Sequence, residues 1–165
     1  MTFAISRATL VGVSDMKVIG WREWVALPDL DISRIKAKVD TGARSSSLHA
    51  YDIEVFSRGS RDYVRFVVHP VQRETKTTIH CVAELHEHRH VKSSSGHREY
   101  RPIIRTSLAL GAERWPIDLT LTTRDAMGFR MLLGREAIRG RFVVEPGRSY
   151  LCRGLVPKRR KRHEA

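Results

Sequence analysis

The sequence predicts an all-β fold in which short strands close into one barrel. Apolar and polar residues alternate over short stretches, and turn signals such as Arg58-Gly59-Ser60-Arg61-Asp62 and Gly111-Ala112 separate these stretches. This pattern is typical of half-buried strands joined by hairpins. No long stretch has the 3.6-residue period of an amphipathic helix. The 165 residues suffice for one domain with a sizeable core.

The expected strands follow one another through the middle of the chain. The first covers residues 18–27, turns at Pro28-Asp29 and leads into a strand that ends at Asp40. Propensity and alternation place the later strands at 48–56, 63–68, 75–85, 103–110 and 115–122. Near the end of the chain, Glu136-Ala137-Ile138 is expected to supply one short helical turn. The strands therefore outnumber the helices by far.

The two ends of the chain differ from this pattern. Residues 1–16 have no sustained period and are expected to form a loose N-terminal arm, whereas residues 17–153 form the folded domain. Residues 154–165 form a basic C-terminal tail that we expect to contact RNA or the ribosome weakly. The apolar run at 8–13 is short and is interrupted by Gly12, so neither a signal peptide nor a membrane span is expected. The sequence thus predicts a cytoplasmic protein that does not contact a membrane.

The composition limits the choice of partner and of redox chemistry. The formal charge of +12 and the isoelectric point near 10.5 favour an acidic partner, and both nucleic acid and acidic peptide qualify. Only 7% of the residues are aromatic, and the Trp residues lie in apolar strand patterns, which disfavours a surface for single-stranded nucleic acid. Cys81 and Cys152 are too few for a disulfide framework and are expected to be reduced thiols.

One stretch carries the strongest chemical signal. Ile35, Ala37 and Val39 alternate with lysines and lead into Asp40, after which Thr41-Gly42 turns the chain. A carboxylate at the end of a rigid strand, beside a tight backbone turn, is the arrangement that acid proteases require. The same letters also occur in ordinary strand-ending Asx turns, so the motif alone leaves both interpretations open.

A second motif narrows the choice. Asp40-Thr41-Gly42-Ala43 and the later segment Leu132-Leu133-Gly134-Arg135 together resemble the retropepsin-like aspartic proteases. With Ile19-Gly20-Trp21-Arg22-Glu23, they resemble a bacterial branch of that group, labelled as ATP-dependent zinc proteases and associated with a RimK-type ligase that adds glutamates to a ribosomal protein. The resemblance implies a retropepsin-like β-barrel with one short C-terminal helix. The chain has no phosphate-binding G-x-x-x-x-G-K-[ST] loop that would support the ATP part of the label.

The resemblance also implies a symmetric homodimer. Aspartic protease chemistry needs two carboxylates that share one proton, and the chain contains only one Asp-Thr-Gly. One Asp40 from each subunit at the twofold axis would supply the pair. Thr41, Gly42 and Ala43 are then the support of the catalytic loop. No cofactor and no metal are expected.

The substrate contacts are also expectations drawn from this resemblance. Retropepsins close a hairpin flap over the substrate, and residues 93–97 are the best candidate for it, with Ser95, Gly96 and His97 expected to contact the substrate. Family members commonly have an acid after Asp-Thr-Gly-Ala, whereas this chain has Arg44, which we expect near Arg135. A local acid such as Glu136 or Asp125 could neutralise them. Alternatively, the two arginines bind substrate carboxylates, so that a glutamate-rich or glutamylated protein is the preferred substrate.

Two other functions remain open at this stage. His86-Glu87-His88-Arg89-His90 satisfies the H-E-x-x-H pattern of zinc proteases, which requires a helix. The segment follows a strand signature, and on a strand the three His share a face while Glu87 points away. The second alternative is a basic binding module on the ribosome or RNA that lacks activity. The interpretation that we favour is an aspartic endopeptidase.

Overall fold

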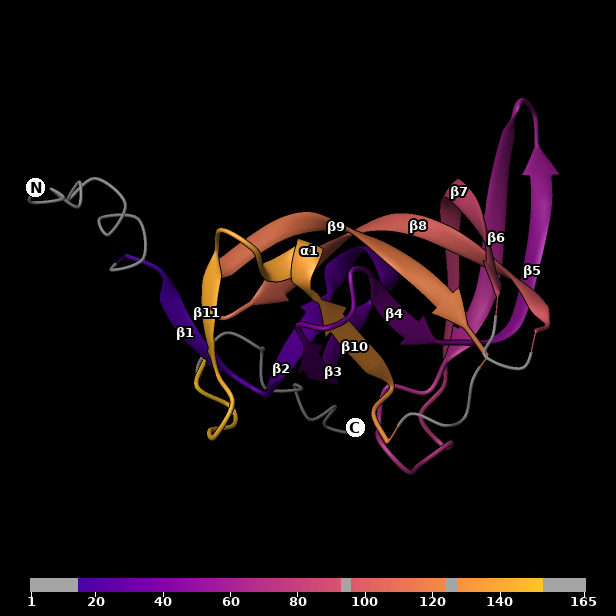
Figure 1. Ribbon diagram of the computed structural model, residues 1–165. Helices are drawn as coiled ribbons and strands as arrows, with labels where there is room; N and C mark the ends of the chain where they lie inside the picture. Colours follow the sequence, from indigo (N-terminus) through magenta and orange to yellow (C-terminus); the bar gives the residue numbers. More distant parts are fainter. Residues whose placement is uncertain (1–14, 93–95, 124–127, 153–165) are drawn as a thin grey trace, which may run out of the picture.

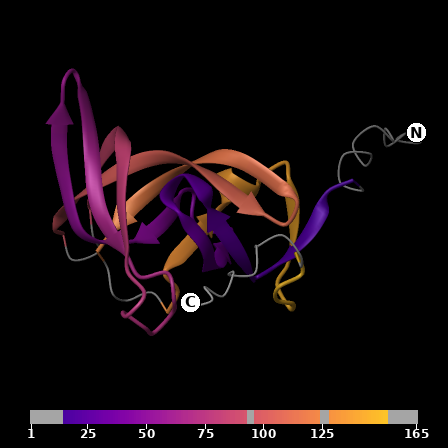
Figure 2. The ribbon, with the colours of Figure 1, turned by 180° about the vertical axis from the view of Figure 1, so that it is seen from behind.

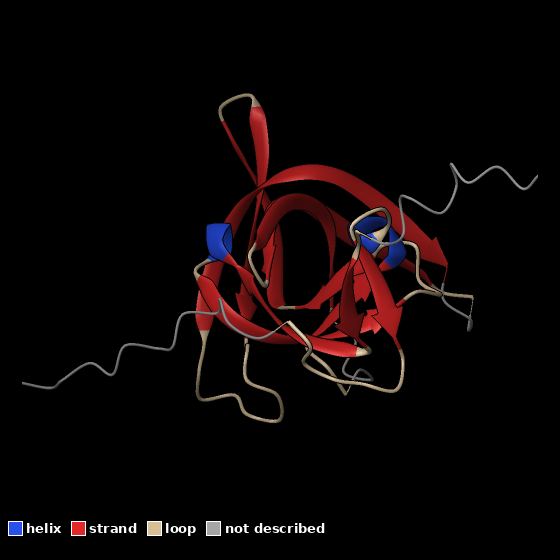
Figure 3. Ribbon diagram, turned by 90° about the vertical axis from the view of Figure 1, so that its left-hand side faces the viewer, coloured by secondary structure: helices blue, strands red, loops and turns tan. Residues whose placement is uncertain are grey.

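A computed structural model describes residues 15–92, 96–123 and 128–152, which form a β-barrel with a flanking sheet (Figure 1). The barrel closes through six strands, and β2 pairs with β8 at Ala26 and Ala109. Figure 3 shows these strands curving into a ring. In spatial order they are β2 (Arg22–Leu27), β3 (Ile32–Asp40), β10 (Met131–Gly134), β4 (Ser46–His49), β9 (Glu113–Thr122) and β8 (Arg98–Leu110).

Three further strands extend the sheet beyond β8. They are β7 (Ile79–Lys92), β6 (Arg61–Val68) and β5 (Tyr51–Arg58), and each is antiparallel to the next. The β5–β6 hairpin projects away from the barrel in both views of the ribbon (Figures 1 and 2). The chain therefore has a closed barrel on one side and an open wing on the other.

The remaining elements do not belong to this sheet. β1 (Lys17–Gly20) and β11 (Phe142–Glu145) form a separate parallel pair, far from the β5–β6 hairpin in Figure 1. A 3₁₀ turn, η2 (Pro28–Leu30), joins β2 to β3, and α1 (Arg135–Ile138) follows β10 directly. No helix in the described part of the chain is both long and apolar enough to cross a membrane.

The core follows from the two-residue period of the strands. In β3, Ile35 and Ala37 are completely buried, while Lys36 between them lies on the outward face. In β9, Ile117, Leu119 and Leu121 point inward by the same rule. The alternation seen in the sequence is thus the division between core and surface.

The expected all-β barrel with one short α-helix is confirmed. Four expected strands have clearly different bounds. The strand expected at 48–56 is divided at Ala50 into β4 and β5, which are not neighbours in the sheet, and the strand expected at 103–110 already begins at Arg98. The strand expected at 18–27 is divided at Trp21 into β1 and β2, which belong to different sheets. The strand expected at 75–85 begins at Ile79, because the Glu74 carboxylate accepts hydrogen bonds from the Thr77 N–H (2.8 Å) and hydroxyl (3.2 Å) and holds a turn there. Most of the N-terminal arm and all of the C-terminal tail lie outside the described residues.

The division at Trp21 has a physical cause in Glu23, which is completely buried. Its carboxylate accepts hydrogen bonds from the Gly20 N–H (2.8 Å), the Leu151 N–H (2.8 Å) and the Cys152 N–H (3.4 Å). A buried carboxylate is stable only when such donors surround it. Glu23 therefore ties the corner between β1 and β2 to the segment at 148–152.

Replacement of Glu23 by Ala is expected to lower the free energy of unfolding by about 2–4 kcal/mol, because several buried N–H groups lose their acceptor. Glu23→Gln keeps the shape and one acceptor oxygen, so its loss is expected to be smaller. Urea unfolding of both variants measures the difference. A loss below about 0.5 kcal/mol in Glu23→Ala, the range of neutral surface changes, would contradict this role.

Candidate active site

The two sequence motifs meet because β10 lies between β3 and β4. β10 is parallel to β3, with Leu133 beside Val39 and Gly134 beside Asp40, and it is antiparallel to β4. The loop at residues 41–45 joins β3 to β4 and therefore passes over the end of β10. Residues far apart in the sequence thus form one compact structure around Asp40.

Asp40 is the last residue of β3, and hydrogen bonds from its own loop orient its carboxylate. Oδ1 accepts the N–H of Gly42 (3.1 Å) and that of Ala43 (3.2 Å). A side chain at position 42 would place its Cβ 3.3 Å from the same oxygen, so glycine lets the backbone approach closely. The side chain of Asp40 is partly exposed, and Thr41 and Gly42 are exposed. The carboxylate is therefore held in position while it remains accessible to a substrate.

The last residue of β10 and the first two residues of α1 donate hydrogen bonds to the same loop and the residue after it. The Gly134 N–H donates to the Ser46 hydroxyl (3.0 Å), the Arg135 N–H to the Ala43 carbonyl (2.9 Å) and the Glu136 N–H to the Arg44 carbonyl (3.2 Å). A Cβ at position 134 would come within 2.5 Å of the backbone carbonyl of Ser45, which no side chain tolerates. The glycine of the apolar-apolar-Gly pattern is thus required for steric reasons.

The charged groups beside the loop are paired locally. The Arg44 Nε lies 2.7 Å from Glu136 Oε1, and Arg135 donates to the Gly42 carbonyl at 3.2 Å. The hydrogen bond from Arg44 lowers the pKa of Glu136, so this carboxylate stays ionised to a lower pH than an ordinary Glu. The sequence left two alternatives for Arg44, neutralisation by a local acid and binding of substrate carboxylates. In the structure, Glu136 neutralises Arg44. Asp125 lies outside the described residues.

The β7–β8 hairpin approaches the loop at 41–45 from the side on which β5, β6 and β7 extend the sheet beyond the barrel. Arg89 of β7 lies 3.4 Å from the Ser45 hydroxyl and 2.7 Å from Glu87. Gly96 and His97, which were expected in the flap, lie in the connection at the tip of this hairpin. Ser95 lies outside the described residues. The assignment of a flap stays a prediction, although the hairpin that carries it does contact the loop at 41–45.

The H-E-x-x-H segment lies on β7 and is not helical. His86, His88 and His90 are exposed on one face, and Glu87 faces the other way toward Arg89. His88 instead contacts Tyr100 on β8, at 2.9 Å from its hydroxyl. No three His, Cys, Asp or Glu side chains in the described ranges are arranged to hold a metal ion. The zinc-protease interpretation is therefore wrong in its geometry.

Two contributors to the site were missed from sequence. Ser46 supplies the hydroxyl that holds Gly134, and Arg89 connects the wing to the loop. Ser46 had a weak signal, since it lies just before the strand expected after the Asp motif and begins β4. Arg89 had none, because its approach depends on the long antiparallel pairing of β7 with β8.

Comparison with known proteins agrees with this architecture. Residues 18–153 match the model of the RimB-like family, described as retropepsin-like aspartic endopeptidase RimB. A solved structure of a protein of unknown function from Legionella pneumophila shares the fold, with a TM-score of 0.69 and 28% identity over 83% of this chain and 98% of that one.

Curated relatives carry a different name. Proteins called probable alpha-L-glutamate ligase from Desulfotalea psychrophila and Parasynechococcus marenigrum are 48% and 49% identical over 79% and 81% of this chain. One from Shewanella pealeana is 45% identical over 86% of it. The chain spans only 28–31% of the length of these relatives, so their name describes much larger proteins. By the family match and the shared fold, the chain belongs to the RimB-like family of retropepsin-like aspartic endopeptidases.

Proposed function

We propose that this protein is an aspartic endopeptidase whose catalytic dyad consists of Asp40 from each subunit of a homodimer. The observation that carries the proposal is the position of Asp40. Its carboxylate is fixed at a strand end by the N–H groups of Gly42 and Ala43, in a loop that Gly134 and Arg135 clamp from below. Such preorganisation serves a reacting group better than a merely structural turn.

The chemistry requires the second subunit. In the dyad, one carboxylate is ionised and removes a proton from water, while the other is protonated and donates its proton to the scissile carbonyl oxygen. The water oxygen bonds to the carbonyl carbon and forms a tetrahedral diol. This intermediate collapses when the C–N bond breaks: the protonated carboxyl gives its proton to the leaving nitrogen, and the ionised carboxylate takes a proton from one hydroxyl of the diol as the carbonyl re-forms. Thr41 braces the two loops across the twofold axis in this proposal.

The substrate in this proposal is an acidic peptide, such as a glutamate-rich or glutamylated protein segment. The charge of +12 favours such a substrate. Arg44 lies on the loop that follows Asp40, and Arg135 at the start of α1 donates a hydrogen bond to the Gly42 carbonyl of that loop. The relatives named glutamate ligases are compatible with a glutamate-bearing substrate, since a ligase and a peptidase act in opposite directions on the same kind of bond. The ligase activity itself belongs to those longer proteins.

The first prediction concerns the reacting group. Asp40→Asn is expected to reduce peptide hydrolysis by about 10³-fold or more, because the amide keeps the shape but cannot exchange the proton. Circular dichroism and urea unfolding are expected to match the wild type. Wild-type turnover in this variant would exclude the aspartic mechanism, whereas the absence of turnover in the wild type itself would favour the inactive binding module.

The second prediction concerns the dyad. Heterodimers of one wild-type and one Asp40→Asn subunit, isolated through two different affinity tags, are expected to be inactive because one chain supplies only one carboxylate. Wild-type homodimers that carry the same two tags are the control. Half of the wild-type activity in the heterodimer would mean that each Asp40 works independently.

A third prediction separates this mechanism from zinc catalysis. Treatment with EDTA, and the double change His86→Ala/His90→Ala, are each expected to leave peptide turnover unchanged, since β7 does not place these side chains as a zinc site requires. Activity that is lost on chelation and restored by zinc would contradict the proposal.

A fourth prediction uses the ion pair beside the loop. Glu136→Gln removes the acid that occupies Arg44, so the ratio of kcat/KM for a glutamate-rich peptide to that for its glutamine-rich counterpart is expected to rise several-fold. Arg44→Ala is expected to lower the same ratio. An unchanged ratio in both variants would show that Arg44 does not contact the substrate.

A further inference from the structure

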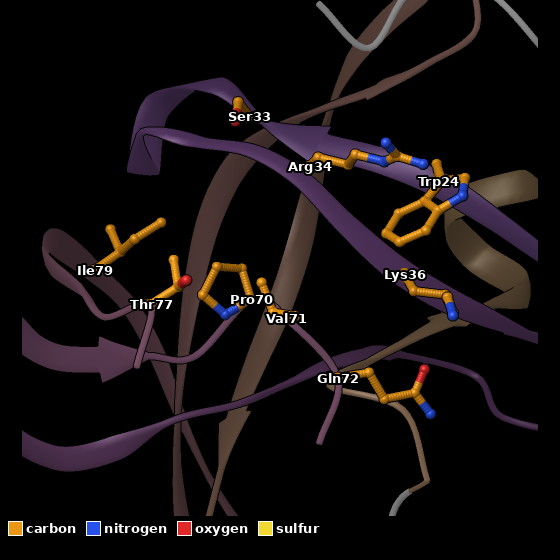
Figure 4. A pocket seen from close by; sticks show the side chains of 9 residues that line it. All are labelled: Trp24, Ser33, Arg34, Lys36, Pro70, Val71, Gln72, Thr77 and Ile79. Carbon is orange, nitrogen blue, oxygen red and sulfur yellow. The ribbon is translucent and has the colours of Figure 1, made fainter. Parts of the chain in front are cut away.

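A groove on the outer face of the barrel lies apart from the catalytic loop. It contains a pocket of about 560 Å³ between the outward face of β2 and β3 and the connection from β6 to β7 (Figure 4). An adjoining hollow of about 280 Å³ shares Lys36 and Gln72 with this pocket and adds Arg22 and Arg73. We call the combined surface the β3 groove and extend it along the strand to Lys38. It consists of Arg22, Trp24, Arg34, Lys36, Lys38, Gln72 and Arg73, with Pro70, Val71 and Ile79 as its apolar wall.

Within the described part of the chain, no carboxylate pairs with the cations of the β3 groove. Arg34, Lys36, Lys38 and Arg73 form no ion pair with any described residue, whereas several surface arginines elsewhere do. Arg65, for example, lies 2.7 Å from a glutamate of the neighbouring strand. Unneutralised cations gathered along one hollow surface attract an anion and add to its binding.

Aromatic rings hold two of the arginines in place. The Arg34 guanidinium lies 3.8 Å from the centre of the Trp24 ring, and Tyr150 stacks on Trp24 at 6.0 Å. Arg22 lies between Trp21 and Tyr150, at 4.6 and 5.0 Å from their ring centres. Stacking restricts the arginines. It leaves the N–H groups of Arg34, and those of Arg22 other than the Nε–H that donates to the Ser149 hydroxyl (3.1 Å), for planar anions such as carboxylates. Because the rings are already covered, a nucleobase has little ring surface on which to stack, and an acidic peptide fits better than RNA.

The spacing of the charges fits an extended chain. Arg34, Lys36, Lys38 and Asp40 occupy alternate positions of β3 on its outward face, so successive side chains are about 6.6 Å apart. Alternate side chains of an extended peptide have the same spacing. The row of cations also ends at the catalytic carboxylate, about 20 Å from Arg34 along the strand. A peptide that follows it would pass from the pocket to Asp40.

We propose that the β3 groove is a docking site for an extended acidic peptide segment that lies outside the catalytic loop. Carboxylates of the segment pair with Arg34, Lys36 and Lys38, and the aliphatic parts of its side chains contact Pro70, Val71 and Ile79, of which Val71 is 44% exposed. The statement that this docking supplies substrate to Asp40 rests on the endopeptidase function proposed above; the binding itself does not.

The test measures binding without turnover. In an Asp40→Asn background, fluorescence anisotropy reports the Kd of a labelled glutamate-rich peptide and of a glutamine-rich peptide of equal length. The added double change Arg34→Gln/Lys36→Gln is expected to weaken binding of the glutamate-rich peptide by about tenfold or more, since two charge-assisted contacts are lost. Binding of the glutamine-rich peptide is expected to be weak in every variant.

The matched control is Arg58→Gln/Arg141→Gln in the same background. These two arginines also lie against aromatic rings and are exposed, but they lie outside the β3 groove. The control removes the same charge and is expected to change the Kd by less than about threefold, because only the long-range field is reduced. An equal loss in both double variants would show that net charge alone attracts the peptide and would overturn the proposal.

A third arm uses a labelled single-stranded oligoribonucleotide of the same formal charge as the glutamate-rich peptide. If the groove variant loses affinity for RNA and keeps its affinity for the peptide, the surface is a nucleic-acid site and the proposal is wrong. Circular dichroism and urea unfolding verify that each variant is folded. Because the background is inactive, peptide docking stands or falls independently of whether the wild type cleaves peptides.

Discussion

The placement of β10 between β3 and β4 is the constraint on which the rest of the site depends. It forces the loop at 41–45 to cross the end of β10, where only a glycine leaves room for the backbone of Ser45. The crossing then provides the donors and acceptors that fix the loop, with Gly134, Arg135 and Glu136 donating to Ser46, Ala43 and Arg44. The geometry of Asp40 is therefore a consequence of strand order, and the closed barrel with its buried core makes that order rigid.

The distribution of charge differs between two surfaces that border Asp40. Beside α1, Arg44 is paired with Glu136, and Arg89 is paired with Glu87. Along β3, no described acid neutralises Arg34, Lys36 or Lys38. The net charge of +12 is thus not spread evenly, and a formal total would not distinguish the paired surface from the unpaired one. Local pairing is what separates a structural cation from one available to a ligand.

The sequence predicted correctly those structural features that depend on residues adjacent in the chain. The strand that ends at Asp40, the short helix after Gly134 and the non-helical H-E-x-x-H segment were all predictable from local patterns. The surface on which Arg22 and Arg34 lie against aromatic rings was not predictable. The expectation that the Trp residues lie in apolar strands disfavoured such a surface. Trp24 in fact lies outward, opposite Lys36. Such a surface depends on the register between β2 and β3, which no local pattern reveals.

The bonds around Asp40 also limit what a second subunit must contribute in the proposed enzyme. Both N–H groups that orient the carboxylate come from its own loop, and the residues that clamp the loop come from its own β10 and α1. Dimerisation therefore does not need to order the loop and has only to bring a second carboxylate near the first. Two adjacent carboxylates share one proton. Approach of the second chain therefore changes the protonation of the pair more than it changes the shape of the loop. In this scheme the subunit equilibrium, rather than folding of the loop, controls the fraction of active enzyme.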